Sequence, residues 1–503
     1  MHRRTFLGLT ASLPLFQVFG CSSNDDVPPQ DDAGTDTGKA DLGTDAAPDA
    51  LADAAEDGSV SKAYQPLTPL KNTSTTPNTF EATIVVRAST QRVLGKPVEL
   101  WTYNDTFPSP LIVVNEGDHV KITVDNQLDE DTTIHWHGFP VPPSMDGGPM
   151  DPIAPKTTKV YEFDLPADFA GTFWYHPHPH MRAGFQVAHG MAGMFIVKPK
   201  ADPVPAEYVE RHLFIEDLKL ADDGTIAPID RTDRLNGREG NHLLVNGVEN
   251  PELPIAPGEK QRWRIVNATS ARFLRLSIPG HTLTQISTDG GLLEAPVKTS
   301  EVFLTPAMRV DVIVEGTGAA GSRVALQALP YDRGHMLGDL LSKQFDVLTL
   351  VYGTTAATPP KDLPAKLRTI VPYGTTTATQ RLVFNEVLTG GDFAMLINDK
   401  SYEMGRTDLT SKIGVIEEWE AFNQGNMDHP LHIHGTQFQV VSRELGGTVT
   451  PEPFVAWRDV AVLHPGETVR LRIKQDFLGE RMVHCHILEH EDMGMMASLE
   501  VVA

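Results

Sequence analysis

Cysteine is nearly absent from this sequence. The 503 residues include only Cys21 and Cys485, which excludes a disulfide framework as the source of stability. Basic residues are also scarce: 42 Lys and Arg stand against 66 Asp and Glu, and the net charge of −24 argues against nucleic acid as a partner. The hydrophobic share of 40% is ordinary, so most of the chain should fold, and its length predicts roughly two to four domains.

Long hydrophobic runs are missing as well. The apolar run from Phe6 to Phe19 is too short to span a bilayer as a helix. It follows the pair Arg3-Arg4, which is typical of a signal that exports folded proteins, and it leads into Gly20-Cys21, which resembles a lipoprotein cleavage site. We expect residues 1–21 to be an export signal and Cys21 to carry a lipid anchor, on a protein of the periplasm or cell surface. The alternative is an ordinary cleaved signal in which Cys21 has no role.

Residues 22–77 are expected to be a tether and lead-in. Between residues 24 and 60 the chain is rich in Asp, Ala, Gly, Thr and Pro and has almost no large apolar side chains. Such a segment cannot bury enough surface to offset the entropy lost on ordering. We therefore expect a disordered acidic tether there.

Short β-rich runs begin near residue 78. Examples are residues 82–87, 111–114 and 119–125, each bounded by Gly, Pro, Asn or Asp. Many short strands between turn residues are typical of β-sandwiches, so long helices should be few.

A weak internal repeat divides this region. A turn leading into an alternating strand that ends at Asn occurs at residues 115–126, 256–267 and 415–423. The spacing predicts three domains of similar size. Linker-like segments at Asp202–Pro205 and Thr358–Lys361 place them at residues 78–202, 203–360 and 361–503.

Histidine is the strongest feature of the sequence. Ten of the 19 histidines fall in four tight groups within the first and last domains, namely His135 and His137; His176 and His178; His429, His432 and His434; and His484, His486 and His490. Side chains two residues apart on a strand share a face, so each His-x-His presents two imidazoles together. Imidazole is a common metal ligand. Four such groups predict metal sites; the alternative is a set of hydrogen-bonded core histidines.

The last histidine group indicates which metal. Cys485 lies between His484 and His486, and it should point to the opposite face of the strand. With His429, His490 and Met495 it offers two imidazoles, a thiolate and a thioether, which is the blue-copper ligand set. Zinc is the competing metal, although zinc has little use for a thioether. The Cys485 backbone would then join two kinds of metal site by a short covalent path.

These motifs resemble those of the multicopper oxidases, the family of laccases, bilirubin oxidases and copper-efflux oxidases. The likeness runs from about residue 78 to the C-terminus and rests on His137-Gly138, Asp146–Pro149, Trp174–His178 and His484–Asp492. It implies an all-β fold of three tandem cupredoxin-like Greek-key β-sandwich domains, with no copper motif in the second.

The resemblance also implies four copper ions. The electron-entry (type 1) copper would be held by His429, Cys485, His490 and Met495. The type 2 copper would be held by His135 and His432. The type 3 pair would be held by the remaining set, His137, His176, His178, His434, His484 and His486. Two further histidines, His180 and His189, do not match ligand positions and are expected to be structural.

The implied reaction is the four-electron reduction of dioxygen to water by a substrate that gives electrons one at a time. Carboxylates must supply protons near the copper cluster, and Asp146 and Glu491 hold the acidic positions of the bacterial branch. The alternative is that both are ordinary surface acids, or that Asp146 is a turn residue before Gly147-Gly148. Residues 355–428 contain only Met395, Met404 and Met427, which puts a dedicated cuprous oxidase in doubt. Phenols or aromatic amines are therefore the first choice of substrate, and cuprous or ferrous ions the second.

Two other classes of function remain as alternatives. Some relatives in this family have lost their coppers and serve as structural or cell-division proteins, and a plain copper electron carrier would need only one copper motif. The intact histidine groups argue against both. We expect a monomer.

The Cys21 expectation can be tested in cells. Lipidated protein should sediment with membranes, and Cys21→Ala should release it because the acyl chains would have no attachment point. The measurement is the distribution of the protein between soluble and membrane fractions. Wild-type protein found wholly in the soluble fraction would remove the anchor and leave the oxidase prediction untouched.

Overall fold

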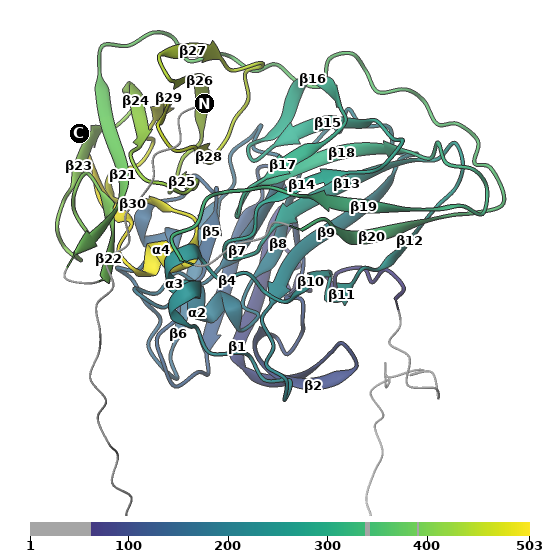
Figure 1. Ribbon diagram of the computed structural model, residues 1–503, viewed down its shortest axis with the longest axis horizontal. Helices are drawn as coiled ribbons and strands as arrows, with labels where there is room; N and C mark the ends of the chain where they lie inside the picture. Colours follow the sequence, from purple (N-terminus) through teal and green to yellow (C-terminus); the bar gives the residue numbers. More distant parts are fainter. Residues whose placement is uncertain (1–61, 338–342, 390–391) are drawn as a thin grey trace, which may run out of the picture. The chain divides into compact units, whose positions relative to one another are not determined.

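The computed structural model describes residues 62–337, 343–389 and 392–503. The expectations for the export signal, Cys21 and the tether up to residue 61 lie outside the described residues. Across the described residues the chain is almost entirely β (Figure 1), and its helices are short: α1 (Pro143–Asp146), α2 (Ala183–Ala188), α3 (Arg231–Asn236) and α4 (Leu488–Asp492). None of these helices is long and apolar enough to cross a membrane.

The first part of the fold consists of two four-stranded sheets. One has the strand order β2 (Lys96–Tyr103), β1 (Thr79–Val93), β4 (His119–Asn126), β6 (Thr158–Asp164). The other has the order β3 (Ile112–Asn115), β8 (Gly193–Lys198), β7 (Gly171–His176), β5 (His135–His137).

The middle part has a seven-stranded and a five-stranded sheet. The larger has the order β11 (Val248–Glu249), β10 (His242–Val245), β9 (Val209–Leu218), β13 (Lys260–Asn267), β18 (Arg309–Glu315), β15 (Leu283–Thr288), β16 (Gly291–Thr299). The smaller has the order β12 (Glu252–Ile255), β20 (Phe345–Tyr352), β19 (Arg323–Leu329), β14 (Leu274–Ser277), β17 (Val302–Leu304).

The last part has a six-stranded and a five-stranded sheet. The first has the order β22 (Asp392–Ile397), β21 (Thr379–Thr389), β24 (Ile416–Asn423), β29 (Glu467–Lys474), β26 (Phe438–Leu445), β27 (Thr448–Pro451). The second has the order β23 (Leu409–Lys412), β31 (Met496–Val502), β30 (Gly479–Cys485), β25 (His429–Ile433), β28 (Val460–Leu463). The predicted all-β fold is confirmed; the domain boundaries near residues 203 and 360 stay predictions.

The internal repeat is confirmed by topology. Strands β4, β13 and β24 each pair in parallel with the first long strand of their part and antiparallel with the next strand of the sheet. Each ends at a buried asparagine, Asn126, Asn267 or Asn423, whose side-chain amide donates to at least two backbone carbonyls. An asparagine at the equivalent position therefore holds the equivalent loop in each of the three parts of the chain.

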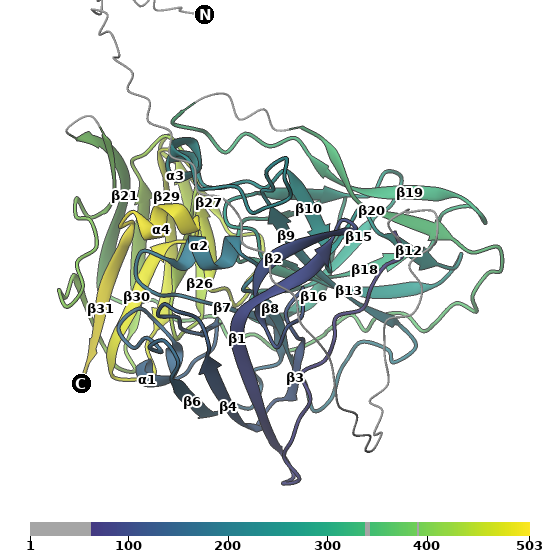
Figure 2. The same ribbon diagram turned by 90° about the horizontal axis from the view of Figure 1, so that it is seen from below.

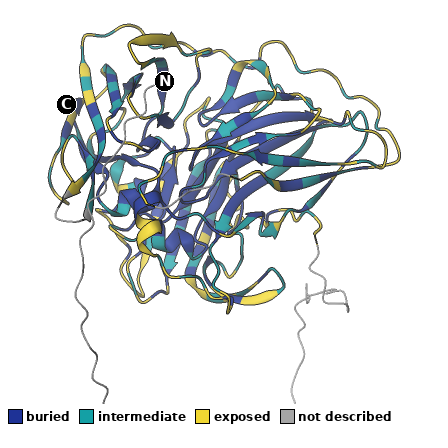
Figure 3. Ribbon diagram, in the orientation of Figure 1, coloured by how far each residue is buried: buried dark blue, intermediate teal, exposed yellow. Residues whose placement is uncertain are grey.

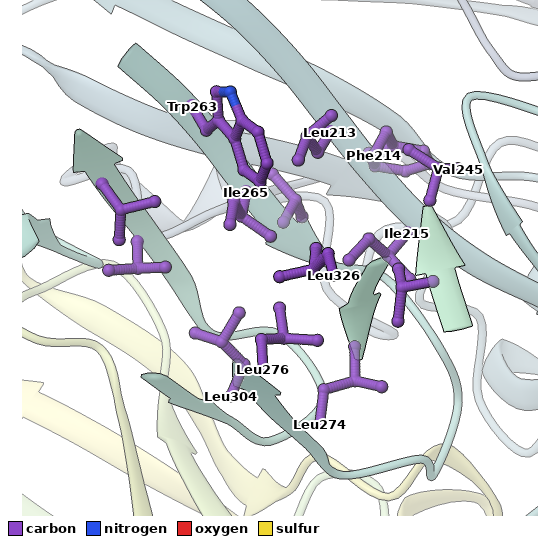
Figure 4. Packing of buried hydrophobic residues seen from close by; sticks show 14 of the residues in the cluster. Leu213, Phe214, Ile215, Val245, Trp263, Ile265, Leu274, Leu276, Leu304 and Leu326 are labelled. Carbon is purple, nitrogen blue, oxygen red and sulfur yellow. The ribbon is translucent and has the colours of Figure 1, made fainter. Parts of the chain in front are cut away.

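The cores lie between the paired sheets, where the strands are buried (Figure 3). In the middle part, Trp263 and Ile265 of β13 point into the same core as Leu276 of β14 and Leu304 of β17 (Figure 4). The lead-in joins this core as well, since Leu67 is buried in it and Ala63 pairs with Glu252. Residues 62–77 are thus part of the folded region.

Two features bring the histidine groups together. Strand β5 pairs with β7, which sets His135 opposite His176, and β25 pairs with β30, which sets His432 opposite His484. Helices α2 and α3 both pack against α4, the segment that follows β30 and carries His490 (Figures 1 and 2).

Asn267 offers a test of the repeat's structural role. Asn267→Ala should lower the free energy of unfolding by about 1–3 kcal/mol, because the Leu304 carbonyl loses a buried donor, and the Arg272 carbonyl and the Thr269 hydroxyl each lose one of their partners. Urea denaturation measures the change. The matched control is Thr355→Ala, an exposed position where a change within about 0.5 kcal/mol is expected. Equal stability of the two variants would contradict the prediction.

Candidate metal centre

Eight predicted ligands from the first and last parts of the chain meet in one buried cluster. None is more than 1% exposed: His135, His137, His176, His178, His432, His434, His484 and His486. The Nε2 atoms of His434 and His484 lie 2.9 Å apart, and those of His178 and His484 lie 3.3 Å apart. The Nε2 atoms of His135 and His432 lie 3.4 Å apart. Lone-pair nitrogens at this spacing, with no protein donor between them, form a site for metal ions.

The outer nitrogens of most of these rings are fixed by the surrounding chain. The Nδ1 atoms of five rings donate to backbone carbonyls or a carboxylate 2.7–3.0 Å away, and these are His135, His176, His432, His434 and His484. An Nδ1–H that is engaged in this way leaves Nε2 as the free lone pair. Sequence spacing had predicted paired imidazoles; the choice of nitrogen comes from these contacts.

Burial also sets the charge of the cluster. Burial, reinforced by neighbouring imidazoles, lowers the pKa of His484 to about 3. Burial also lowers the pKa of six further members well below the ordinary histidine value, namely His137, His176, His178, His432, His434 and His486. Neutral imidazoles are the form that binds metal ions.

A second group lies on the other face of β30. The Cys485 sulfur is 3.5 Å from His429 Nδ1 and 3.9 Å from His490 Nδ1, and all three residues are fully buried. Met495 is buried in the same hydrophobic cluster, and its backbone carbonyl accepts a hydrogen bond from Cys485 N. Burial raises the pKa of the Cys485 thiol, so a cation beside the sulfur is needed to keep it a thiolate.

The two predicted acids lie against the histidine cluster. Asp146 Oδ2 accepts a hydrogen bond of 2.7 Å from His434 Nδ1, and the Asp146 carbonyl accepts from His135. Glu491 lies 3.2 Å from His484 Nδ1 and 3.4 Å from His178 Nδ1. Both acids are buried, so the alternative of ordinary surface acids is wrong.

Two acids of the site were missed by sequence reasoning. Asp459 contacts His137 through its carboxylate and His432 through its carbonyl. Glu386 on β21 accepts from His429 Nε2 at 2.9 Å. Neither acid lies in a histidine motif, so no local spacing could have marked them.

His180 and His189 lie outside the metal-capable groups found among the described residues. The His180 ring packs on Tyr402, with ring centroids 5.3 Å apart. His189 donates from Nδ1 to the Phe185 carbonyl and packs on Trp101. Both contacts agree with a structural role.

Comparison with known proteins points to one family. Three family profiles described as multicopper oxidase match residues 85–202, 215–323 and 370–503. A multicopper oxidase of Staphylococcus haemolyticus is 32% identical over 409 residues, covering 79% of this chain and 83% of the relative.

Solved structures agree. A multicopper oxidase from Campylobacter jejuni described as a metallo-oxidase is 41% identical, with a TM-score of 0.82 and coverage of 88% of this chain and 95% of that one. A laccase from Pediococcus acidilactici is 30% identical, with a TM-score of 0.78 and coverage of 88% and 94%. Relatives named cell division protein FtsP also match, at 28% identity over 424 residues for that of Xenorhabdus nematophila.

The chain belongs to the multicopper oxidase family. It is an oxidase built from three cupredoxin-like β-sandwich domains, and its family implies copper in the buried histidine groups. Multicopper oxidases use dioxygen together with reducing substrates or metal ions.

Cys485 provides the sharpest test of the smaller site. Cys485→Ser should abolish the intense blue absorption, because that colour depends on the copper–thiolate bond. The chain should still fold and keep most of its other copper, since the eight-histidine cluster does not use the sulfur. Absorption spectra and copper analysis measure both. Met482→Leu, a buried change on the same strand, is the control and should stay blue. A blue and active Cys485→Ser variant would end this interpretation.

Proposed function

We propose that this protein couples one-electron oxidation of a reducing substrate to the four-electron reduction of dioxygen to water, using four coppers. The observation that carries the proposal is that neighbouring side chains at the end of β30 belong to two different groups of predicted ligands. Cys485 faces His429 and His490, while its neighbours His484 and His486 belong to the eight-histidine cluster. One covalent segment therefore joins an electron-entry site to a cluster able to hold several metal ions.

The donor atoms fit copper. Two imidazoles and a thiolate, with a methionine buried beside them, suit the type 1 site formed by His429, Cys485, His490 and Met495. His135 and His432 would hold the type 2 copper through their facing Nε2 atoms. When bound, copper supplies the one-electron chemistry that side chains lack.

The remaining six histidines separate into two sets of three. His178, His434 and His484 direct their Nε2 atoms to one point. The rings of His137 and His176 lie 5.0 and 5.3 Å from that of His486, and within the described residues His137 Nδ1, His176 Nε2 and both His486 nitrogens lack a hydrogen-bond partner. Buried nitrogens without partners are costly unless a ligand satisfies them. We assign one copper of the type 3 pair to each set.

Proton supply is the second part of the proposal. Burial, together with the nearby carboxylates of Asp492 and Glu489, raises the pKa of Glu491 well above its ordinary value, which favours the protonated form of this acid. Asp146 approaches the cluster from the other side, through His434. We propose that Asp146 and Glu491 relay protons to the site of dioxygen reduction.

The relay can be separated from electron supply. Asp146→Asn and Glu491→Gln keep the size of each side chain and remove the acid, so copper content and blue colour should survive. Turnover with dioxygen should fall by about 10²-fold or more, because general acid catalysis is lost. Stopped-flow reoxidation of the reduced enzyme measures the effect. Asp151→Asn, an exposed acid five residues from Asp146, is the control. Reoxidation of both variants at the wild-type rate would make these acids structural.

Phenols or aromatic amines are our first choice of reductant, and metal ions are the second. Two observations support the second choice. The most identical solved structure named above is a metallo-oxidase. In addition, both outer imidazole nitrogens at the predicted type 1 site are covered: His429 Nε2 donates to buried Glu386, and His490 Nε2 donates to the Leu235 carbonyl of α3. Because these nitrogens are covered, an aromatic substrate would have to transfer its electron to the predicted type 1 site from the outer side of α3.

A side-by-side rate comparison decides between these reductants. We expect a phenol to give a higher kcat/KM than cuprous or ferrous ion, measured as oxygen consumption at a fixed enzyme concentration. A metal-ion value about tenfold above the phenol value, or roughly 1.4 kcal/mol in activation free energy, would make the protein a metallo-oxidase. Copper content near zero without oxygen consumption would instead support a structural role, and copper at one site alone an electron carrier.

We also propose that the protein works outside the cytoplasm as a monomer, with a lipid anchor at Cys21. The N-terminal motif supports export, and dioxygen and small reductants are available there. Size-exclusion chromatography with light scattering tests the oligomeric state.

A further inference from the structure

The middle domain holds no copper motif, yet one of its side chains is linked to the eight-histidine cluster through a single acid, Asp459. Arg309, the first residue of β18, is fully buried. Its guanidinium has five N–H groups, and all five are used. Nε donates to the Thr172 carbonyl, Nη1 to the Ala307 carbonyl and Asp459, and Nη2 to the Asp289 carbonyl and Asp459. Arg309 thus joins all three domains at one point.

The ion pair with Asp459 is bidentate, with both N···O distances 2.6 Å. Such a pair fixes the plane of the carboxylate as well as its position. The close approach also demands glycine at residue 138, next to a predicted ligand. A Cβ there would collide with the Asp459 carboxylate and lie 2.8 Å from Arg309 Nη2.

Asp459, held in this way by Arg309, accepts hydrogen bonds from two predicted copper ligands. Its Oδ1 accepts a hydrogen bond of 3.1 Å from His137 Nε2, and its backbone carbonyl accepts one of 2.8 Å from His432 Nδ1. His137 differs from the neighbouring histidines in which of its ring nitrogens carries the hydrogen. Its Nε2 carries the donated hydrogen, so Nδ1 is left as the lone-pair nitrogen, and no described residue pairs with Nδ1.

We propose that Arg309 is a positioning residue for the copper cluster, acting from a domain that binds no copper of its own. Through Asp459 it holds His137 in the orientation that offers Nδ1 to the metal. This inference rests on the proposed copper cluster. Its alternative is a purely structural role, in which Arg309 only ties the domains together.

Arg264 provides a matched control. It is also a buried arginine of the middle domain, and it also reaches Thr172, through the hydroxyl, while pairing with Asp311. Within the described part of the chain its polar contacts are with Thr172, Asp311 and Glu210, and neither Asp459 nor a predicted ligand is among them. A lysine at either position keeps the charge and loses the fork of donors. Both variants therefore disturb a link between the first and middle domains at Thr172, and only Arg309→Lys disturbs the contact with Asp459 and, through it, His137.

The test is copper retention by the purified full chain during dialysis against a graded chelator, with thermal denaturation and electron paramagnetic resonance alongside. Arg309→Lys should weaken the least tightly held copper by about 10–100-fold, as expected when the partner that orients a ligand is disturbed. The resonance of the cluster should change, while the blue band of Cys485 stays. Arg264→Lys should lower the melting temperature without either change.

Equal copper retention and identical resonance spectra in the two lysine variants would overturn the inference. If Arg309→Lys fails to fold, Asp459→Asn decides by the same criteria, because it removes the ionic contact and keeps the side-chain size. The copper content of the wild-type chain separates this outcome from a failure of the proposed function: a wild-type chain that binds no copper refutes the cluster itself.

Discussion

The alternation of side chains along an extended segment is the constraint on which this site depends. At the end of β30, Cys485 points to one face while His484 and His486 belong to the other, so two different metal environments lie one residue apart. Pairing with β25 repeats the arrangement, since His432 and His434 join the cluster and His429 lies beside the sulfur. The proposed electron-entry site and the proposed site of dioxygen reduction are therefore held apart by a fixed length of backbone.

The second determinant is the charge state of the buried imidazoles and of the acids around them. Burial favours the neutral form of seven of the eight imidazoles. The acids named around them are each held against a ring: Asp146 on His434, Glu491 beside His178 and His484, Asp459 on His137. Among these acids, Asp459 is balanced by a buried arginine, whereas burial favours the protonated form of Glu491. Carboxylates in one cluster can thus have different roles, one holding a ligand and another holding a proton.

The middle domain contributes without a metal-binding motif. Arg309 uses every donor of its guanidinium to hold Thr172, Asp289, Ala307 and Asp459. On our proposal the middle domain serves the cluster by fixing one residue from each outer domain, Thr172 and Asp459.

Much of this protein could be predicted from local sequence. The alternation of short strands and the repeat ending at Asn126, Asn267 and Asn423 depend on spacings of a few residues, and so do the four histidine groups and the cysteine between two of them. The roles of Asp459, Glu386 and Arg309 could not be predicted, because each acts on a residue tens or hundreds of positions away and none lies in a histidine motif. The sequence by itself determined which ligand types are present and which pairs share a face. Only the tertiary structure decided which nitrogen of each ring is free, because that depends on which acceptor the folded chain places beside the ring: for His434 and His137 the acceptor is an acid from another domain, and for His176 and His484 it is a neighbouring backbone carbonyl.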